Sequence, residues 1–215
     1  MTEPTARRPA ALQDRSRRSQ QGILLAGRAL LEEGGLEALT VAAVAERAGM
    51  AVGSIYRRFG DKEGLLQAIQ HDFTETLLAE IAERASVERL RILRDPAVAI
   101  AEAVGAIADA FHSHQALLRV FLLLGTQHER VWSEGSRVSV EGNRRFAETL
   151  EHVAIAHADR AAALDFAFRL TYAALAHRIT QGEFLESERP LSWNELRSRL
   201  QTAAISYLLG TPESR

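Results

Sequence analysis

One short stretch of the sequence gathers side chains that suit contact with a polyanion. Tyr56, Arg57 and Arg58 are consecutive, and the only lysine of the chain, Lys62, follows four residues later. A phenol and two guanidinium groups can donate hydrogen bonds to phosphate oxygens or to the acceptor edge of guanine. An ammonium group at the start of a helix does not stabilise the helix, but it suits a phosphate that the helix N-terminus also attracts. The stretch therefore predicts a contact with nucleic acid.

Two short helices should position these side chains. Thr40 is a hydroxylated residue of the type that caps a helix start, and the apolar residues of 41–48 recur at helical spacing. Gly49 suits the left-handed backbone of a helix end, and a second short helix is expected over residues 53–59. Asp61 then caps a longer helix. Two short helices joined by a glycine-containing turn form a helix-turn-helix, whose second helix enters the major groove of DNA.

This segment resembles the DNA-binding segment of the TetR-type repressor family, in which an Ala-Gly, a short turn and Gly-(Ser/Thr)-hydrophobic-Tyr-x-x-Phe-x-x-Lys-(Glu/Asp)-x-Leu are typical. The residues that carry the resemblance are Ala48, Gly49, Gly53, Ser54, Ile55, Tyr56, Phe59, Lys62, Glu63 and Leu65. One departure is Ala51, where the family often has a serine that caps the recognition helix; its absence weakens the cap by about 1 kcal/mol. The match covers residues 20–66.

The chemistry of the side chains and the resemblance together predict a set of DNA contacts. The residues in this set are Arg17, Thr40, Gly53, Ser54, Tyr56, Arg57 and Lys62. Ser54, Arg57 and the backbone at Gly53 would face base edges, whereas Thr40, Tyr56 and Lys62 would hold phosphates. Arg17 follows a basic N-terminal arm, and this basic segment would contact phosphate or the minor groove. The alternative for this arm is a solvated tail.

The composition excludes several classes of protein. The 215 residues contain no cysteine, which excludes disulfides and thiolate sites. No apolar run reaches the length of a membrane span, and the N-terminus lacks the apolar region of a signal peptide, so a soluble cytoplasmic protein is expected. Residues 1–70 hold 10 Arg and Lys against 8 Asp and Glu, whereas the whole chain has a formal net charge of −2. This mild asymmetry would turn the N-terminal part towards DNA.

The hydrophobic pattern predicts an all-α protein in three parts. These are a disordered basic arm over residues 1–14, a helix-turn-helix DNA-binding domain over 15–62, and a helical body over 63–215 that the resemblance identifies with ligand binding and dimerisation. Helices are expected at residues 15–33, 40–48, 53–59, 61–85, 95–113, 115–124, 129–156, 159–181 and 192–208, with residues 86–94 forming a charged helix end and loop.

The resemblance implies a small-molecule pocket in the body, with mostly apolar walls and a few polar groups. The aromatic and histidine residues expected to line it are Phe111, His114, Phe121, Trp132, Phe146, Phe166 and Tyr172. For each aromatic residue taken alone, the alternative is a place in the ordinary core.

The resemblance also implies a homodimer, because two half-sites of an operator require two recognition helices related by a two-fold axis. The helix expected over 159–181 is apolar on two faces, which indicates burial on two sides. The residues predicted to form the interface are Leu164, Phe168, Leu175, Ile179, Leu196, Leu200, Ala204 and Tyr207. The alternative is burial of these residues within one subunit.

Together these features predict a transcriptional repressor that a small, largely apolar ligand releases from a pseudo-palindromic double-stranded DNA operator. The sequence has no glycine-rich phosphate loop, no nucleophile elbow and no pair of histidines at i, i+4 beside a carboxylate, so no enzyme, cofactor or metal site is expected. Two alternatives stay open. One is a DNA-binding regulator without a ligand, and the other is a helical metal-binding protein or enzyme with a vestigial helix-turn-helix.

Overall fold

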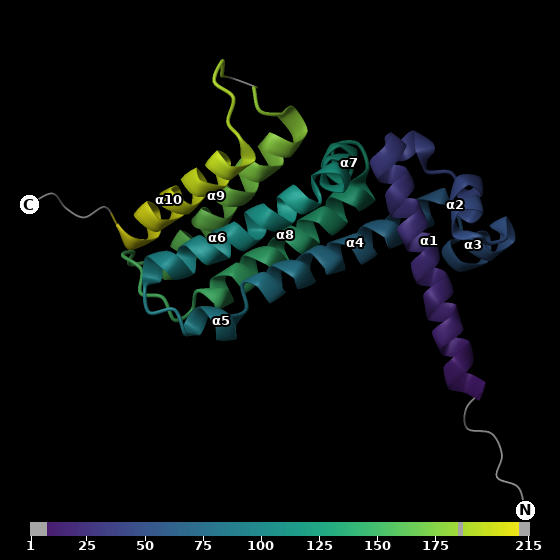
Figure 1. Ribbon diagram of the computed structural model, residues 1–215, viewed down its shortest axis with the longest axis horizontal. Coiled ribbons are helices and arrows are strands. Elements are labelled where there is room, and N and C mark those ends of the chain that lie inside the picture. The colour runs from purple at the N-terminus through teal and green to yellow at the C-terminus, as the bar shows by residue number, and fades with distance from the viewer. Residues whose placement is uncertain (1–7, 185–186, 211–215) are drawn as a thin grey trace, which may run out of the picture. The chain divides into compact units, whose positions relative to one another are not determined.

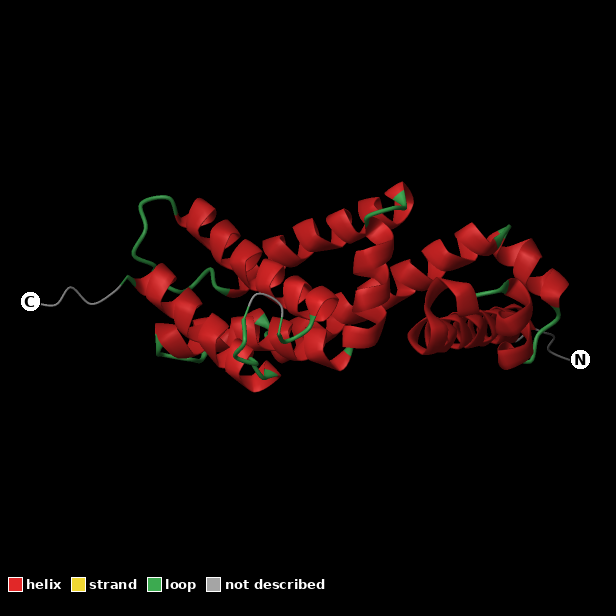
Figure 2. Cartoon of the chain, turned by 90° about the horizontal axis from the view of Figure 1, so that it is seen from above, coloured by secondary structure: helices red, strands yellow, loops and turns green. Residues whose placement is uncertain are grey.

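The computed structural model describes residues 8–184 and 187–210, and every regular element within these ranges is an α-helix (Figure 2). The helices are α1 (Arg8–Ala38), α2 (Val41–Ala48), α3 (Val52–Phe59), α4 (Lys62–Arg84), α5 (Val87–Arg91), α6 (Pro96–Ser113), α7 (Gln115–Gly125), α8 (Glu129–Thr149), α9 (Arg160–Gln181) and α10 (Trp193–Leu209). The all-α fold class is therefore confirmed.

The chain divides into two compact units, Met1–Phe73 and Thr74–Arg215, and the boundary between them falls inside α4. Sequence analysis instead placed the end of the DNA-binding domain at residue 62, where α4 begins. That boundary concerns function rather than compactness, and it stays a prediction.

The first helix starts earlier than the sequence pattern indicates. α1 already includes residues 8–14, which were assigned to a disordered arm, whereas residues 1–7 of that arm lie outside the described residues. From the sequence, the start of a helix is predicted where apolar residues begin to recur at helical spacing. Residues 8–14 contain Ala and Leu but no such pattern. The predicted end is confirmed, because Gly34 and Gly35 have non-helical backbone angles, with φ of −145° and 63°.

The two helices of the helix-turn-helix begin and end as their local sequence predicts. The hydroxyl oxygen of Thr40 accepts a hydrogen bond from the Ala43 N–H at 3.0 Å, which caps α2. Gly49 ends α2 in the left-handed conformation, at φ 63° and ψ 36°. Ala51 precedes α3 and makes no side-chain cap, as the departure from the family pattern predicts.

α4 packs very closely against the elements that precede it. A Cβ atom added to Gly64 would lie 2.1 Å from the carbonyl oxygen of Phe59, the last residue of α3. The carboxylate of Asp61 accepts a hydrogen bond from the Gly64 N–H at 2.7 Å, which caps α4 as expected. Only glycine therefore fits this turn, since the opposing atom belongs to the backbone and cannot rotate away.

In the second unit, α6 packs against α9 and α10, while α7 and α8 pack against each other and against α9 (Figure 1). Leu117, Leu150 and Leu175 are fully buried in this core. A polar seam joins α6 to α10, where Arg197 Nε donates to the carboxylate of Asp109 at 2.8 Å. The body is thus a helical bundle with its own core.

Two predictions about the helices of the body are wrong. The charged stretch 86–94 contains the short helix α5, which Ser86 caps by accepting a hydrogen bond from the Arg89 N–H at 3.2 Å. In addition, α8 ends at Thr149 rather than near residue 156. The chain turns there, and the guanidinium of Arg160 donates to the carbonyl oxygens of Leu150 and Val153, both at 2.5 Å.

Among the described residues, no helix combines the length and the apolar character that a membrane span requires.

The close approach at Gly64 leads to a stability prediction. Replacing Gly64 with Ala should lower the free energy of unfolding by about 1–3 kcal/mol, because the new methyl group meets a backbone oxygen. The matched control is Gly53→Ala in α3, where an added Cβ has nothing within 4 Å. That variant should be as stable as the wild type or about 1 kcal/mol more stable. Urea unfolding followed by circular dichroism measures both, and equal effects would contradict the steric argument.

Candidate nucleic-acid interface

The recognition helix α3 is anchored by one residue and leaves one face open. Ile55 is only 1% exposed, so it holds α3 against the rest of the first unit. Tyr56 is 50% exposed and Val52 is 42% exposed, and Gly53 and Arg57 lie on the same exposed side. Val52 was missed by sequence reasoning, which placed it in the turn and began the second helix at residue 53. An exposed methyl pair at this position suits the 5-methyl group of thymine.

The residues predicted to meet base edges differ in their exposure. Gly53 faces open space, since an added Cβ would meet no atom within 4 Å. Arg57 is exposed, whereas Ser54 is half-buried on the side of α3 that faces α1. The backbone at Gly53 and the guanidinium of Arg57 are therefore accessible to a large ligand.

The residues predicted to hold phosphates lie at helix starts. Thr40 precedes α2, and its hydroxyl can still donate a hydrogen bond while its oxygen accepts the cap. Lys62 opens α4, and its ammonium donates to the Leu36 carbonyl oxygen at 2.9 Å. The three donors of a lysine leave two for another partner. Both side chains are exposed, as a contact with phosphate requires.

The two remaining arginines of the predicted surface lie in different surroundings. Arg17 is exposed on α1, in a part of the chain where the sequence also predicts the first helix. Arg58 was expected beside Arg57 on the flank of α3, but its guanidinium donates to the carbonyl oxygen and the hydroxyl of Ser16, at 3.3 and 3.1 Å. Arg58 therefore links α3 to α1, a contact between residues far apart in sequence.

The residues predicted to line a ligand pocket fall into two groups. Phe111, Phe121 and Phe146 are buried, and Tyr172 is largely buried, where burial raises the pKa of its phenol. Phe111 contacts Tyr172 edge-on, with 5.8 Å between ring centroids. Tyr172 in turn stacks on Phe168 at 6.3 Å, and Phe168 contacts Phe146 at 5.9 Å. A continuous row of aromatic rings therefore runs through the body.

Trp132 and Phe166 do not belong to this row, and their assignment to a pocket stays a prediction. Trp132 is 62% exposed on α8, and Phe166 is 49% exposed on α9. The ring of Phe166 instead contacts Tyr207 of α10, with 5.1 Å between centroids. When both faces of a helix are apolar, the presence of aromatic residues does not show which face packs inside.

The residues predicted to form the dimer interface are mostly buried within the single chain. Seven of them have exposed fractions of at most 9%: Leu164, Phe168, Leu175, Ile179, Leu196, Leu200 and Ala204. Tyr207 is half-buried. These side chains pack inside the body, and their assignment to a dimer interface stays a prediction. The other apolar face of α9, with Phe166 and Leu170, is the exposed one.

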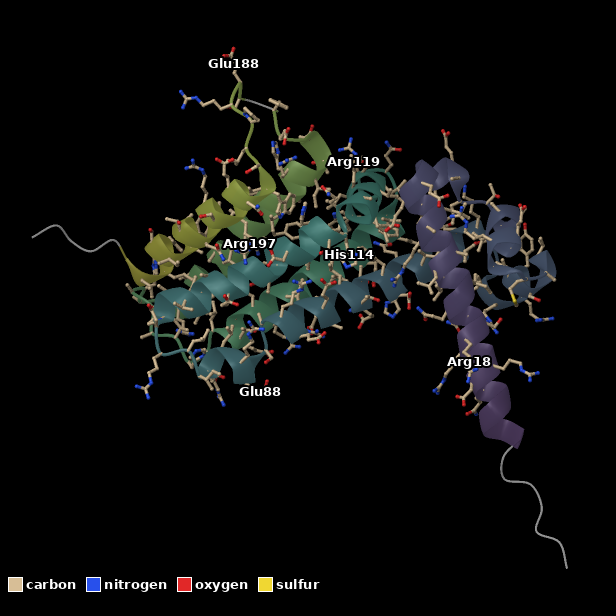
Figure 3. The ribbon with its side chains drawn as sticks, viewed as in Figure 1. Arg18, Glu88, His114, Arg119, Glu188 and Arg197 are labelled. Carbon is tan, nitrogen blue, oxygen red and sulfur yellow. The ribbon has the colours of Figure 1, made fainter. Side chains whose placement is uncertain are left out.

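A polar pair in the body connects α4 to the junction of α6 and α7. His114, labelled in Figure 3, lies at that junction, and its Nε2 is 2.7 Å from a carboxylate oxygen of Glu80 on α4. Partial burial alone would raise the pKa of Glu80, but hydrogen bonds from His114 and Arg84 outweigh it and hold the pKa below its usual range. His114 therefore makes a structural contact to α4, and its assignment to a pocket stays a prediction.

No group of three or more His, Cys, Asp or Glu side chains is arranged to hold a metal ion within the described parts of the chain.

Two short helices joined across a left-handed glycine, the second with an exposed basic face, define the chain as a helix-turn-helix protein. The sequence pattern of the family described as "Bacterial regulatory proteins, tetR family" matches residues 23–69. Residues 23–69 of the chain therefore carry the DNA-binding segment that is typical of this family.

Similar proteins agree with this placement. The HTH-type transcriptional repressor AcnR of Corynebacterium glutamicum is 34% identical over 84 residues, which cover 39% of this chain and 45% of that protein. The HTH-type transcriptional regulator BetI of Burkholderia ambifaria is 30% identical over 97 residues, covering 45% of this chain and 48% of that protein. The match thus spans less than half the length of these curated relatives.

The fold continues beyond the matched segment. A crystal structure assigned to the TetR-family transcriptional regulators, from Mesorhizobium loti, superposes with a TM-score of 0.71 over 90% of this chain and 96% of that chain. Its sequence identity is 16%, so it supports the fold of the body and no detail of its ligand.

The Glu80–His114 pair leads to a prediction with a defined sign. Because the pKa of Glu80 is lowered in the folded state, its carboxylate contributes stability that is fully present above about pH 5 and is lost as the pH falls through the folded pKa. Glu80→Gln should therefore cost about 1–2 kcal/mol at pH 7 and progressively less towards pH 3. Urea unfolding at pH 7, 5, 4 and 3 tests this, and a difference independent of pH would contradict it.

Proposed function

We propose that this protein is a transcriptional repressor that binds double-stranded operator DNA through α3. The observation that carries the proposal is the exposed face of α3, where Val52, Gly53, Tyr56 and Arg57 lie outward while Ile55 anchors the helix. A surface that combines an accessible backbone, a phenol and a guanidinium suits both phosphates and base edges. The family and the similarity to AcnR and BetI support the same conclusion.

The proposed contacts divide into two kinds. Arg57 and the backbone at Gly53 read base edges, because a guanidinium can bind guanine through two hydrogen bonds and a glycine lets the helix approach closely. Thr40, Tyr56 and Lys62 hold phosphates at the starts of α2 and α4 and along α3, where helix N-termini also attract anions. Phosphate contacts fix the position of the helix, and base contacts supply the sequence preference.

The repressor acts as a homodimer in this proposal, because two half-sites require two recognition helices. The exposed apolar stripe of α9 supports a specific interface. Phe166 is 49% exposed and Leu170 is 40% exposed, and Ala162 and Ala173 extend the same stripe at helical spacing. Ala203 is exposed on the neighbouring α10, and small residues there allow two copies to approach. This stripe replaces the buried residues first assigned to the interface.

A small, largely apolar ligand is proposed to regulate DNA binding from the body. The row formed by Phe111, Tyr172, Phe168 and Phe146 offers aromatic walls and one phenol hydroxyl, which is the usual chemistry of a small-molecule site. Because burial raises the pKa of Tyr172, its hydroxyl stays protonated and can donate a hydrogen bond. The ligand can shift the repressor towards its non-binding state only by as much free energy as its preference for that state provides.

The DNA proposal predicts the effects of substitutions at Tyr56. Fluorescence anisotropy with the DNA upstream of the protein's own gene, compared with shuffled DNA of the same length, should show a preference of about 10³-fold or more that persists as salt rises. Tyr56→Ala should weaken binding to both DNAs by a similar factor, because a phosphate contact carries no sequence information. Tyr56→Phe, which loses only the hydroxyl, separates the hydrogen bond from the ring.

Absence of binding to either DNA would overturn the proposed function. Equal and steeply salt-dependent binding to both DNAs would show that the upstream DNA is not the operator. Unchanged affinity in Tyr56→Ala would contradict the assignment of Tyr56 to a phosphate.

The dimer proposal predicts that Leu170→Glu yields monomers. A carboxylate in the middle of an apolar interface is desolvated without a partner, which opposes association. Because Leu170 is already 40% exposed, the helix content should not change. Size-exclusion chromatography with light scattering measures the mass. Ile92→Glu, at an apolar residue 78% exposed outside the stripe, is the matched control and should stay dimeric. If Leu170→Glu remains a dimer, the interface lies elsewhere and the prediction is contradicted.

A further inference from the structure

Two N–H groups are buried without an acceptor where α9 ends and α10 begins. Trp193, the first residue of α10, is 9% exposed, and its indole Nε1 has no hydrogen-bond partner among the described residues. The Nε of Arg178, in the last turn of α9, is likewise buried and has no acceptor there. Buried donors are almost always paired, because a donor that leaves water without gaining an acceptor costs free energy. The two N–H groups therefore point to an acceptor that the described residues do not supply.

The two donors belong to one cluster, which three helices hold in place. The guanidinium carbon of Arg178 lies over the ring of Trp193, 6.0 Å from its centroid. The imidazole of His112, in the last turn of α6, stacks on the same indole, with 4.8 Å between centroids and 22° between the ring planes. The carboxylate of Glu195 accepts a hydrogen bond from the Ser192 N–H at 3.1 Å in a capping box, so it is already used. Arg178 and Trp193 thus present their donors close together on a fixed support.

The charges around the cluster favour an anion. Arg178 Nη2 donates to the carboxylate of Glu183 at 2.9 Å, and this carboxylate is 42% exposed in the connection that follows α9. Arg119, labelled in Figure 3, reaches the same end of α9 from α7, where its guanidinium donates to the carbonyl oxygens of Ile179 and Thr180 at 2.8 and 2.6 Å. Arg119 forms no ion pair within the described ranges. Its positive charge is therefore not balanced by a carboxylate contact.

The arrangement of the donors selects a carboxylate among the possible anions. The Nε and Nη2 groups of a guanidinium form a fork that matches the two oxygens of a carboxylate. Glu183 uses only the Nη2 side of this fork, which leaves Nε beside the indole N–H of Trp193. A phosphate would bring four oxygens and up to two charges to a place with two available donors. A carboxylate can satisfy both donors with its two oxygens.

We propose that Arg178 and Trp193 bind the carboxylate group of a small organic acid, which competes with Glu183 for the guanidinium. This carboxylate site is separate from the aromatic row of the body. His112 follows Phe111, which belongs to that row, and successive residues point about 100° apart around a helix. The two sites therefore lie on different sides of α6, and binding of the acid does not depend on the proposed binding of DNA.

Acetate is the probe, because it consists of a carboxylate and one methyl group. Thermal unfolding of the full-length protein is followed by circular dichroism in sodium acetate and in sodium chloride, at pH 7 and equal ionic strength. A ligand that binds only the folded state raises the Tm. Half-saturation is expected at roughly 1–10 mM, as for so small a ligand. A tenfold excess over that concentration should raise the Tm by about 3–5 °C relative to chloride.

Two substitutions each remove one donor. Arg178→Gln should abolish the difference between acetate and chloride. Trp193→Phe keeps an aromatic ring for His112 to stack on but loses the N–H, so it should weaken acetate binding by about tenfold or more. If Arg178→Gln does not fold, Trp193→Phe decides. Arg169→Gln is the matched control on α9, because the Nε of Arg169 already donates to Asp165 at 2.6 Å, and this variant should respond to acetate like the wild type.

A substitution of Glu183 separates a ligand site from an internal ion pair. Glu183→Gln removes the competing carboxylate and should tighten acetate binding several-fold. If Glu183→Gln instead unfolds at a lower Tm in chloride and acetate has no effect on it, Glu183 is itself the partner of both donors, and the proposal is overturned.

Two other results would overturn the proposal. One is an equal Tm of the wild type in acetate and chloride. The other is an acetate effect that persists in both Arg178→Gln and Trp193→Phe, which would show a general effect of the solvent. None of these measurements involves DNA, so the carboxylate site and the proposed function are tested separately.

Discussion

The exposed surface of α3 depends on a backbone contact at the turn between α3 and α4. Gly64 passes so close to the carbonyl oxygen of Phe59 that no side chain fits, and the carboxylate of Asp61 holds the Gly64 N–H. The direction of α3 relative to α4 is therefore determined by backbone atoms. With Ile55 buried, rotation of α3 about its own axis is opposed as well. The exposed residues of α3 are thus presented on a rigid support, which base recognition requires.

The parts of the fold that the sequence predicts well are those with local causes. The caps at Thr40 and Asp61 involve partners three residues away, so the residue type and its spacing are sufficient to identify them. The all-α class and most helix bounds follow from the same signals. Helix α5 was missed because three of its five residues are charged and Leu90 is its one buried residue, so no apolar periodicity marks it.

The parts that the sequence does not predict depend on contacts between distant residues. α9 carries apolar residues on two faces, and periodicity shows that both are apolar without showing which one packs inside. Leu164 and Phe168, which the sequence assigns to the dimer, are buried within the chain, whereas Phe166 and Leu170 are exposed. The partner of Arg58 likewise lies 42 residues away, in α1. A pattern along one helix contains no information about a side chain that arrives from another.

The C-terminal half of α4 is held from two sides within the second unit, and this sets a condition for regulation. On one side Glu80 meets His114, and on the other the hydroxyl of Thr149 on α8 donates to the Ala85 carbonyl oxygen at 3.4 Å. Arg137 of α8 adds a contact to Glu75 at 3.0 Å. A ligand among the aromatic rings moves α4 only if it alters these contacts differently in the two states. A ligand that leaves them equal shifts no population, however tightly it binds.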